Sequence, residues 1–355
     1  AENYGETGMG SRGRSDAMAD INSEDIESIS VLTGAAAAAL YGSQAANGAI
    51  VITTKKGSKD KTTLSVSSNT EVTQPVLYYQ FQNRYGNNAG EATSWGKLLP
   101  ENYRFNYNPA SDYLQNGVIS NVNVNFSTGN ERNQTFASAG AVNSMGNIPN
   151  NAYNKYSVTF RNTSSFVKDK LHLDVSAQYI RQNDRNMINQ GVYLNPLVGA
   201  YLYPRGENWD YCRTYEQYSA TRKISLQNWP WMKLGGVEWD NPYWLNNRVL
   251  RTDNKNRFLV SGGLTWDILD WLKLAGRARM DYTSNQYEDK RYASTNTTLT
   301  DGSSNGFYQT ENAVDRQIYA DVLLMINKSF GENWTLNANI GASISDIYSY
   351  TLYNG

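Results

Sequence analysis

The chain has 355 residues and almost balanced charge, with 32 Lys and Arg against 33 Asp and Glu and a formal net charge of −1. This length suffices for two soluble domains or for part of one large barrel. Phosphate-driven nucleic-acid binding needs a basic excess, so the charge argues against that class. The single Cys212 excludes an internal disulfide framework and a multi-cysteine zinc site. One histidine, His172, argues against metal clusters and Ser-His-Asp chemistry.

Mean hydropathy is low, at −0.61. No run of about 18 apolar residues occurs, so we expect no transmembrane helix. Barrel strands alternate apolar and polar residues, and a hydropathy average conceals them. The 26 tyrosines and nine tryptophans, with abundant Asn, Ser and Thr, are typical of a barrel with a wet interior and aromatic girdles.

Residues 25–57 follow a loop-like stretch rich in Gly, Ser and Arg, and they read DIESISVLTGAAAAALYGSQAANGAIVITTKKG. Alternating apolar residues lead into an alanine run, which favours a helix, and Gly42 suits the end of that helix. Asn47-Gly48 is a strong turn signal, and β-branched residues follow it. The pattern predicts strand, short helix, turn and strand. A small βαβ-like piece of a soluble protein is the alternative.

From Thr62 onward the pattern changes to a period of two, with apolar and polar residues alternating. In the clearest segment, 171–183, Leu173 and Val175 alternate with Asp174 and Ser176. We expect nine strands in this part of the chain. Their ranges are 62–74, 118–128, 133–143, 153–164, 171–183, 256–266, 271–284, 313–328 and 334–348.

The connections between these strands alternate in length. Short ones (129–132, 165–170, 267–270 and 329–333) alternate with medium or long ones (75–117, 144–152, 184–255 and 285–312). An up-and-down barrel in an outer membrane has short periplasmic turns and longer extracellular loops. Trp266, Trp271, Phe330 and Trp334 lie beside short turns, where aromatic rings favour a membrane interface. Core residues of a soluble sheet are the alternative for these aromatics.

The stretch 25–57 resembles the segment that closes the plug domain of SusC/RagA-family TonB-dependent outer-membrane transporters. The motif positions that carry this resemblance are Asp25, Ile26, Glu27, Val31, Leu32, Tyr41, Gly42, Asn47, Gly48, Thr53, Thr54, Lys55 and Gly57. The run Asp240-Asn241-Pro242-Tyr243-Trp244, with Arg257 and Asp281 further on, also resembles this family, in which N-P-Y-W closes a long loop before a strand.

The resemblance implies a mainly all-β fold. Residues 1–57 would be the C-terminal part of a plug, with a small α+β character. Residues 58–355 would supply about the first nine strands of an antiparallel transmembrane β-barrel, with long extracellular loops at 75–117, 184–255 and 285–312. Such plugged barrels have about 22 strands. No signal peptide is visible at Ala1, so the chain is either processed or incomplete, and because a complete single-chain bacterial barrel needs an even number of strands we expect it to be incomplete.

The same resemblance implies a function in transport, not catalysis. A multi-pass barrel in the outer membrane of a Bacteroidota-type bacterium would import oligosaccharides or other glycans. The TonB-ExbB-ExbD complex would drive this uptake, and a SusD-like surface lipoprotein would cover the extracellular mouth. Import of oligopeptides is the alternative within the class. A passive porin and a surface glycan-binding β-protein are more distant alternatives. We expect no cofactor and no metal.

The two longest loops, 75–117 and 184–255, are rich in tyrosine and tryptophan. Long structureless loops are usually functional, and exposed aromatics indicate either a binding surface or mutual packing into a cap. We expect about half of these side chains only to pack the loops. The candidates for contact with substrate or lid are Tyr78, Tyr79, Trp95, Trp209, Tyr211, Trp229, Trp231 and Trp239.

Overall fold

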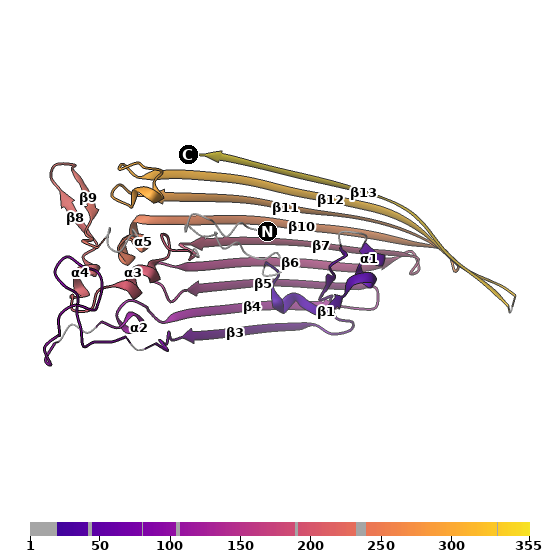
Figure 1. The fold of residues 1–355 in the computed structure, drawn as a ribbon. Helices are drawn as coiled ribbons and strands as arrows, with labels where there is room; N and C mark the ends of the chain where they lie inside the picture. The colour runs from indigo at the N-terminus through magenta and orange to yellow at the C-terminus, as the bar shows by residue number, and fades with distance from the viewer. Residues whose placement is uncertain are drawn as a thin grey trace.

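The computed structural model describes residues 20–41, 45–79, 81–103, 107–188, 191–231, 239–331 and 333–355. Its main element is one nine-stranded sheet in the order β13-β12-β11-β10-β7-β6-β5-β4-β3 (Figure 1). Every neighbouring pair is antiparallel. The strands are β3 (Thr63–Thr73), β4 (Gly117–Gly129), β5 (Asn133–Met145), β6 (Ala152–Phe166), β7 (Leu171–Arg185), β10 (Val249–Leu269), β11 (Leu272–Arg291), β12 (Phe307–Phe330) and β13 (Trp334–Asn354).

All nine strands predicted from the alternation are present, but eight are longer than predicted, and β10, β11, β12 and β13 are longer by at least six residues. β10 begins at Val249, where the sequence predicted loop, and pairs there with Arg291 at the end of β11. The loop predicted at 285–312 therefore shrinks to 292–306. The added residues are largely polar on both faces, so side-chain alternation is lost while the backbone ladder continues.

The alternation of connection lengths is confirmed. The short turns 130–132, 167–170, 270–271 and 331–333 lie at one end of the sheet, and the connections 74–116, 146–151, 186–248 and 292–306 lie at the other (Figure 1). The long connections are not structureless, however. They contain α2 (Pro109–Asp112), α3 (Pro196–Leu202), α4 (Asp210–Arg213), α5 (Pro242–Arg248), η3 (Thr297–Leu299) and the hairpin of β8 (Glu216–Ser219) and β9 (Ile224–Gln227).

A shared local signal starts three of these loop helices. Asn108, Asn195 and Asn241 each precede a proline, and each asparagine side chain accepts a hydrogen bond from the backbone N–H two residues later. Asparagine is a strong N-cap, and proline suits the first helical position because its missing N–H has no partner there anyway. These Asn-Pro pairs could have been recognised in the sequence.

Residues 23–54 form a separate small unit. It contains η1 (Ser23–Asp25), β1 (Ile26–Leu32), α1 (Gly34–Tyr41) and β2 (Ala49–Thr54). Strands β1 and β2 pair antiparallel, unlike the two strands of a βαβ unit, which run parallel. Gly48 has a φ of +110°, as its Asn-Gly turn requires. Gly42 lies outside the described residues.

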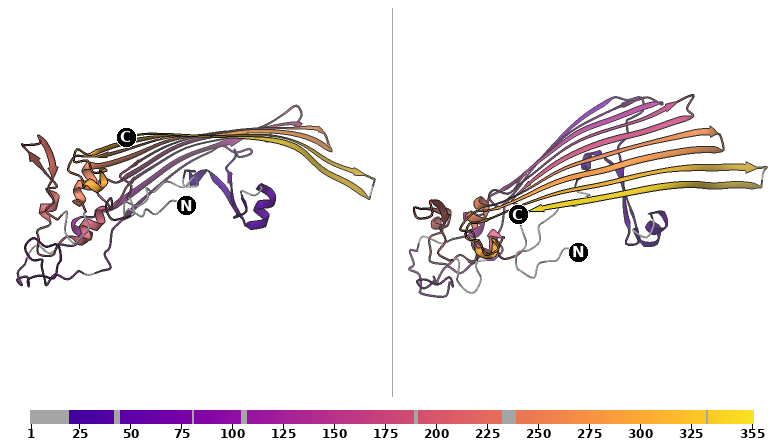
Figure 2. Two further views of the ribbon diagram at one scale, coloured as in Figure 1. Left: turned by 45° about the horizontal axis from the view of Figure 1, so that its top comes forward. Right: turned by 90° about the horizontal axis from the view of Figure 1, so that it is seen from above.

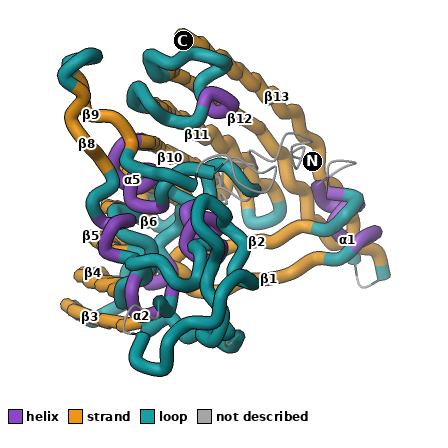
Figure 3. The backbone as a smooth tube through the Cα atoms, turned by 60° about the vertical axis from the view of Figure 1, so that its left-hand side comes forward, coloured by secondary structure: helices purple, strands orange, loops and turns teal. Residues whose placement is uncertain are grey.

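The nine-stranded sheet is curved, and β1, β2 and α1 lie on its concave side (Figures 2 and 3). On β6, Ser157 and Thr159 face this inner side and are buried, whereas Val158 and Phe160 face outward and are exposed. The outer face carries further exposed apolar side chains, including Leu64, Val66, Val122, Val124, Phe126, Val260, Leu264, Met280, Val322, Leu336 and Ile340. The sheet therefore has an apolar outside and a polar inside, the reverse of a soluble sandwich.

No helix in the described residues has the length and apolar character needed to cross a membrane. The aromatic core of the molecule lies instead among the loop helices, at the end of the sheet opposite the short turns.

Candidate functional site

The contact between residues 20–57, here called the N-terminal segment, and the inner face of the sheet is the first candidate site. Because side chains alternate along a strand, every second residue of each strand faces the concave side of the sheet, where this segment lies. Those residues are mostly hydroxyl, amide and charged side chains. They fix the segment by hydrogen bonds and ion pairs rather than by apolar packing.

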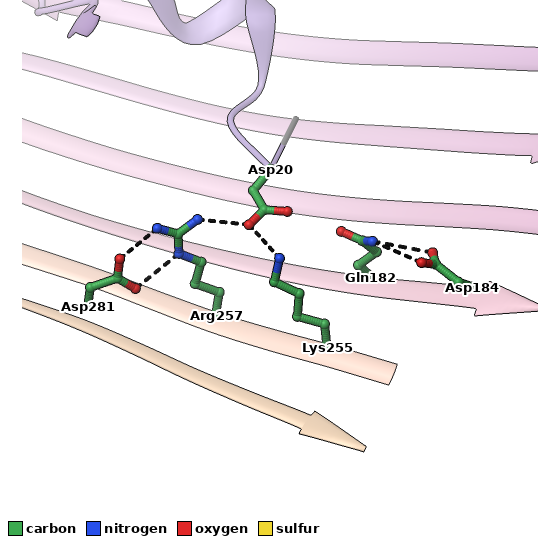
Figure 4. Close-up of polar contacts among 6 residues, drawn as sticks. All are labelled: Asp20, Gln182, Asp184, Lys255, Arg257 and Asp281. Atoms are coloured by element: carbon green, nitrogen blue, oxygen red, sulfur yellow. Dashed lines mark hydrogen bonds and ion pairs between the residues drawn. The ribbon is translucent and has the colours of Figure 1, made fainter. Parts of the chain in front are cut away.

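Asp20 forms the most buried ion pair of this contact. Its side chain is 1% exposed, and Oδ2 lies 2.6 Å from Lys255 Nζ and 2.8 Å from Arg257 Nη1. Arg257 is also held by Asp281 on the neighbouring strand, through Nε at 3.0 Å and Nη2 at 2.6 Å (Figure 4). A paired, hydrogen-bonded arrangement of this kind offsets the desolvation of the buried charges.

Asp25 and Asn22 make a second set of contacts. Thr159 Oγ1 donates a 2.6 Å hydrogen bond to Asp25 Oδ2, and Asn22 Nδ2 donates to Asn123 Oδ1 at 3.0 Å. Gly140 lies beside them on β5, where a Cβ atom would come within 2.8 Å of Asn22 Nδ2. The absence of a side chain at Gly140 therefore lets the N-terminal segment approach the sheet closely.

Arg161 joins the end of β2 to the sheet. Its Nη1 donates to the backbone oxygen of Thr54 at 2.9 Å and to Thr54 Oγ1 at 3.0 Å. Its Nε and Nη2 hold Asp174 on β7 at 3.0 and 2.7 Å. The neighbouring Lys55 donates from its backbone N–H to the Asp25 carbonyl oxygen, which closes the segment on itself.

Gly57 ends the segment where its backbone lies against the first turn of the sheet. A Cβ atom here would overlap the backbone nitrogen of Thr135 and lie 2.8 Å from the carbonyl oxygen of Thr128. Next to this contact is a cavity of about 470 Å³, lined by Glu27, Lys55, Lys56, Gly57, Thr63, Ser65, Asn125, Ser127, Gln134 and Phe136.

The motif residues predicted from the sequence thus divide into two groups. Asp25, Thr54 and Gly57 lie at the contact with the sheet, and Lys55 lines the cavity next to it. The remaining described motif positions belong to the small β1–α1–β2 unit itself: Ile26, Glu27, Val31, Leu32, Tyr41, Asn47, Gly48 and Thr53. Glu27 sits where the β1–β2 register shifts and also lines the cavity.

Sequence reasoning missed most of the partners on the sheet. Arg257 and Asp281 were noted for their resemblance to a family, but Asp20, Asn123, Thr159 and Arg161 were not. The two residues of each of these contacts are 101 to 237 positions apart in the sequence, so no local pattern links them. The usable signal was the alternation, which places Asn123, Thr159 and Arg161 on the polar sides of their strands, whereas Asp20 lies outside any strand.

The loop layer at the far end of the sheet is the second candidate site. Trp209, Trp229, Trp231 and Trp239 are buried in one cluster. The ring of Trp209 stacks on Tyr107, with 3.9 Å between ring centroids. Burial raises the pKa of the Tyr107 hydroxyl and of the nearby Cys212 thiol well above their ordinary values. Other members of the cluster are Tyr113, Ile148, Ala200 and Tyr203.

The eight predicted contact aromatics therefore divide evenly. The four tryptophans of the cluster pack the loops together and are at most 8% exposed, because the Asn-Pro helices fold the loops over them. Tyr78, Tyr79, Trp95 and Tyr211 are 92%, 81%, 75% and 65% exposed. These four side chains are the ones that remain accessible to a ligand or partner.

His172 lies in a polar cluster on the inner face of the sheet. His172 contacts Ser165 Oγ through Nδ1 at 3.0 Å, and its Nε2 lies 3.6 Å from Asp267 Oδ2, on the inner face near the short turns. Within the described ranges, no three His, Cys, Asp or Glu side chains are arranged to hold a metal ion.

Comparison with known proteins finds similarities in both parts of this architecture. The TonB-dependent Receptor Plug Domain family matches residues 4–49. TonB-dependent receptor SusC of Bacteroides thetaiotaomicron is 28% identical over 183 residues, which cover 50% of this chain and 18% of that protein. TonB-dependent receptor P3 of Formosa agariphila is 30% identical over 144 residues, covering 38% and 13%.

Solved structures show the same fold. The RagAB peptide importer in the 'closed-closed' state superposes with a TM-score of 0.67 at 18% identity, over 94% of this chain and 40% of that chain. The structure of the RagAB peptide transporter gives 0.67 at 16%, over 95% and 41%. The chain thus spans less than a fifth of the curated relatives it matches and about 40% of the matched RagAB chain.

Proposed function

We propose that this chain, which is similar to TonB-dependent receptors of the SusC/RagA type, helps to form an outer-membrane transporter for nutrient oligomers. Its nine strands form part of the wall of a larger barrel, and residues 1–57 form the end of the plug that closes the lumen. We propose no catalytic role for any residue.

One observation carries this proposal: the N-terminal segment, from here on called the plug segment, lies on the polar face of a sheet whose other face is apolar. A sheet with this polarity satisfies its backbone in hydrocarbon only when it closes into a barrel. A segment that is fixed inside by buried polar contacts blocks the lumen until those contacts break. An energy source is needed to break them, and the TonB-ExbB-ExbD complex is the partner we propose.

The extracellular side of the transporter is the end that carries the long connections. We propose that a SusD-like surface lipoprotein covers the loops 74–116, 186–248 and 292–306. The packed tryptophan cluster gives these loops a fixed shape on which a lid can close. The proposed order of events is capture of the solute, closure of the lid and displacement of the plug.

Oligosaccharides are the substrates that we favour, and oligopeptides are the alternative. The exposed rings of Tyr78, Tyr79, Trp95 and Tyr211 suit the apolar faces of sugar rings. A mixed surface of aromatic and amide groups also accepts peptides. A growth experiment distinguishes the two classes. A strain that lacks the receptor is grown either on single glycans or on peptide mixtures, and it should fail to grow only on the class that the receptor imports.

TonB dependence and plug deletion test the proposal as a whole. Uptake by the full-length receptor should stop in a strain without TonB, whereas a passive porin would continue. Deletion of residues 25–57 should convert the receptor into an open pore and sensitise cells to large antibiotics such as vancomycin. Unchanged permeability after this deletion would contradict the plug assignment.

A further inference from the structure

The inner face of β10 carries a basic pair that already holds a carboxylate in the resting structure. Lys255 Nζ and Arg257 Nη1 both contact Oδ2 of Asp20, at 2.6 and 2.8 Å. Asp20 comes from the plug segment, whereas the two basic residues belong to the wall (Figure 4). The structure therefore displays a carboxylate bound to the wall by two charge-assisted hydrogen bonds.

The wall, not the plug, orients Arg257. Asp281 of β11 accepts from Nε at 3.0 Å and from Nη2 at 2.6 Å, which fixes the plane of the guanidinium. Nη1 is the nitrogen that faces the plug. The two hydrogen bonds between Arg257 and Asp281 do not involve the plug segment. When Asp20 leaves, Arg257 therefore stays in place, with Nη1 directed into the lumen.

We propose that Lys255 and Arg257 are a carboxylate-binding site of the transport path, which Asp20 occupies at rest and a carboxylate of the solute occupies after the plug has moved. This proposal rests on the proposed transport function and specifies its solute. The solute class is an oligomer that carries a carboxylate, either an acidic side chain of a peptide or a uronate of a glycan.

The surroundings of the basic pair limit how many carboxylates the solute carries. A cavity of about 290 Å³ adjoins Asp20, and four other acidic side chains line it: Asp184, Asp253, Glu311 and Asp315. A second carboxylate on the solute would meet these like charges and be repelled. The site therefore selects a solute with an isolated carboxylate over a polyanion.

An acetate experiment tests the site in the intact receptor. Asp20→Ala removes the resident carboxylate but keeps the plug, so acetate should bind in its place and raise the melting temperature relative to chloride at equal ionic strength. Adding Arg257→Gln to Asp20→Ala should abolish this shift. Adding Arg277→Gln should preserve it, because Arg277 forms a comparable wall pair with Asp321. Equal shifts in all three variants, or no shift in any, would overturn the site.

A solute experiment tests its use in transport. We compare uptake of a C-terminally amidated nonapeptide with one glutamate or one glutamine, and of a hexasaccharide with one glucuronate or one glucose, all carrying the same uncharged fluorophore. The carboxylate form of one pair should enter about tenfold faster at limiting concentration, as charge-assisted hydrogen bonds predict. The pair that shows the preference identifies the source of the carboxylate.

Arg257→Gln should reduce this ratio to about one. The ratio is taken of TonB-dependent uptake, after subtraction of the uptake by a strain without TonB, because a loosened plug adds the same leak to both members of a pair. Uptake of both members without preference would overturn the inference and leave the transport function standing. Absence of all uptake would contradict the transport function, and the acetate shift would still decide the site.

Discussion

Thr159→Val is the substitution that most directly tests the contact between the plug segment and the inner face of the sheet. Valine keeps the shape of threonine but removes the hydroxyl that donates to Asp25 Oδ2 at 2.6 Å. The same hydroxyl accepts from Gln178 Nε2 at 3.2 Å, so the substitution breaks a connected pair of hydrogen bonds. Asp25 is completely buried, and solvent cannot replace the lost donor while the plug is seated.

A buried hydrogen-bond acceptor that loses its donor destabilises the seated plug by about 1–3 kcal/mol, and a charged acceptor lies at the upper end of this range. The unseated plug should therefore become about 5- to 150-fold more populated relative to the seated plug. The assay is the conductance of the full-length receptor in planar bilayers without TonB, with vancomycin sensitivity of cells as a second readout. Thr159→Ser keeps the hydroxyl and should remain close to wild type.

A double-substitution cycle with Asp25→Asn locates the effect. If the hydroxyl acts through the carboxylate, Thr159→Val should cost much less in the Asp25→Asn background than in the wild type. The reasoning would be refuted if Thr159→Val conducts no more than Thr159→Ser, or if its effect is unchanged in the Asp25→Asn background.

Three further predictions concern other parts of the molecule. Gly57→Ala should lower the melting temperature of the receptor and increase vancomycin entry, because overpacking costs about 1–3 kcal/mol. The control is Gly262→Ala, where a Cβ meets only a side chain at 3.8 Å, and it should change the melting temperature and vancomycin entry far less. Burial raises the pKa of Cys212, so its thiol should resist iodoacetamide from about pH 7 to 9 until the protein unfolds, and rapid labelling of the native protein would contradict the packed cluster. Replacing Tyr78 and Tyr79 together by alanine should weaken solute binding without changing the melting temperature, since both rings are exposed; a large loss of stability would reassign them to packing.

The strands were predictable because their physical signal is local. Alternation with a period of two places apolar residues on one face, and this holds wherever the outer face is apolar. It fails at the loop end of β10, β11 and β12, where both faces are polar, so the predicted loops 184–255 and 285–312 were too long. Only backbone pairing, such as Val249 with Arg291, continues the strands there.

The plug segment was recognisable, but its contacts with the wall were not. The turn at Asn47-Gly48 and the alanine helix are local features, whereas the pairing of Asp20 with Arg257 joins residues 237 positions apart. The loop aromatics show a similar limit. Composition predicted that some would pack the loops, but the Asn-Pro helix starts, such as Asn241-Pro242, decide which rings are buried.

A pair of neighbouring residues on β12 tests the central claim most directly. Gln317 lines the inner face and Ile318 points outward. Spin labels on Gln317→Cys and Ile318→Cys in the full-length receptor in liposomes report their surroundings, and the buried Cys212 should stay unlabelled. The label at 318 should relax with lipid-dissolved oxygen and not with a water-soluble nickel chelate, and the label at 317 should show the opposite. A label at 318 that is shielded from oxygen, or that responds to the nickel chelate, would contradict a wall that faces lipid.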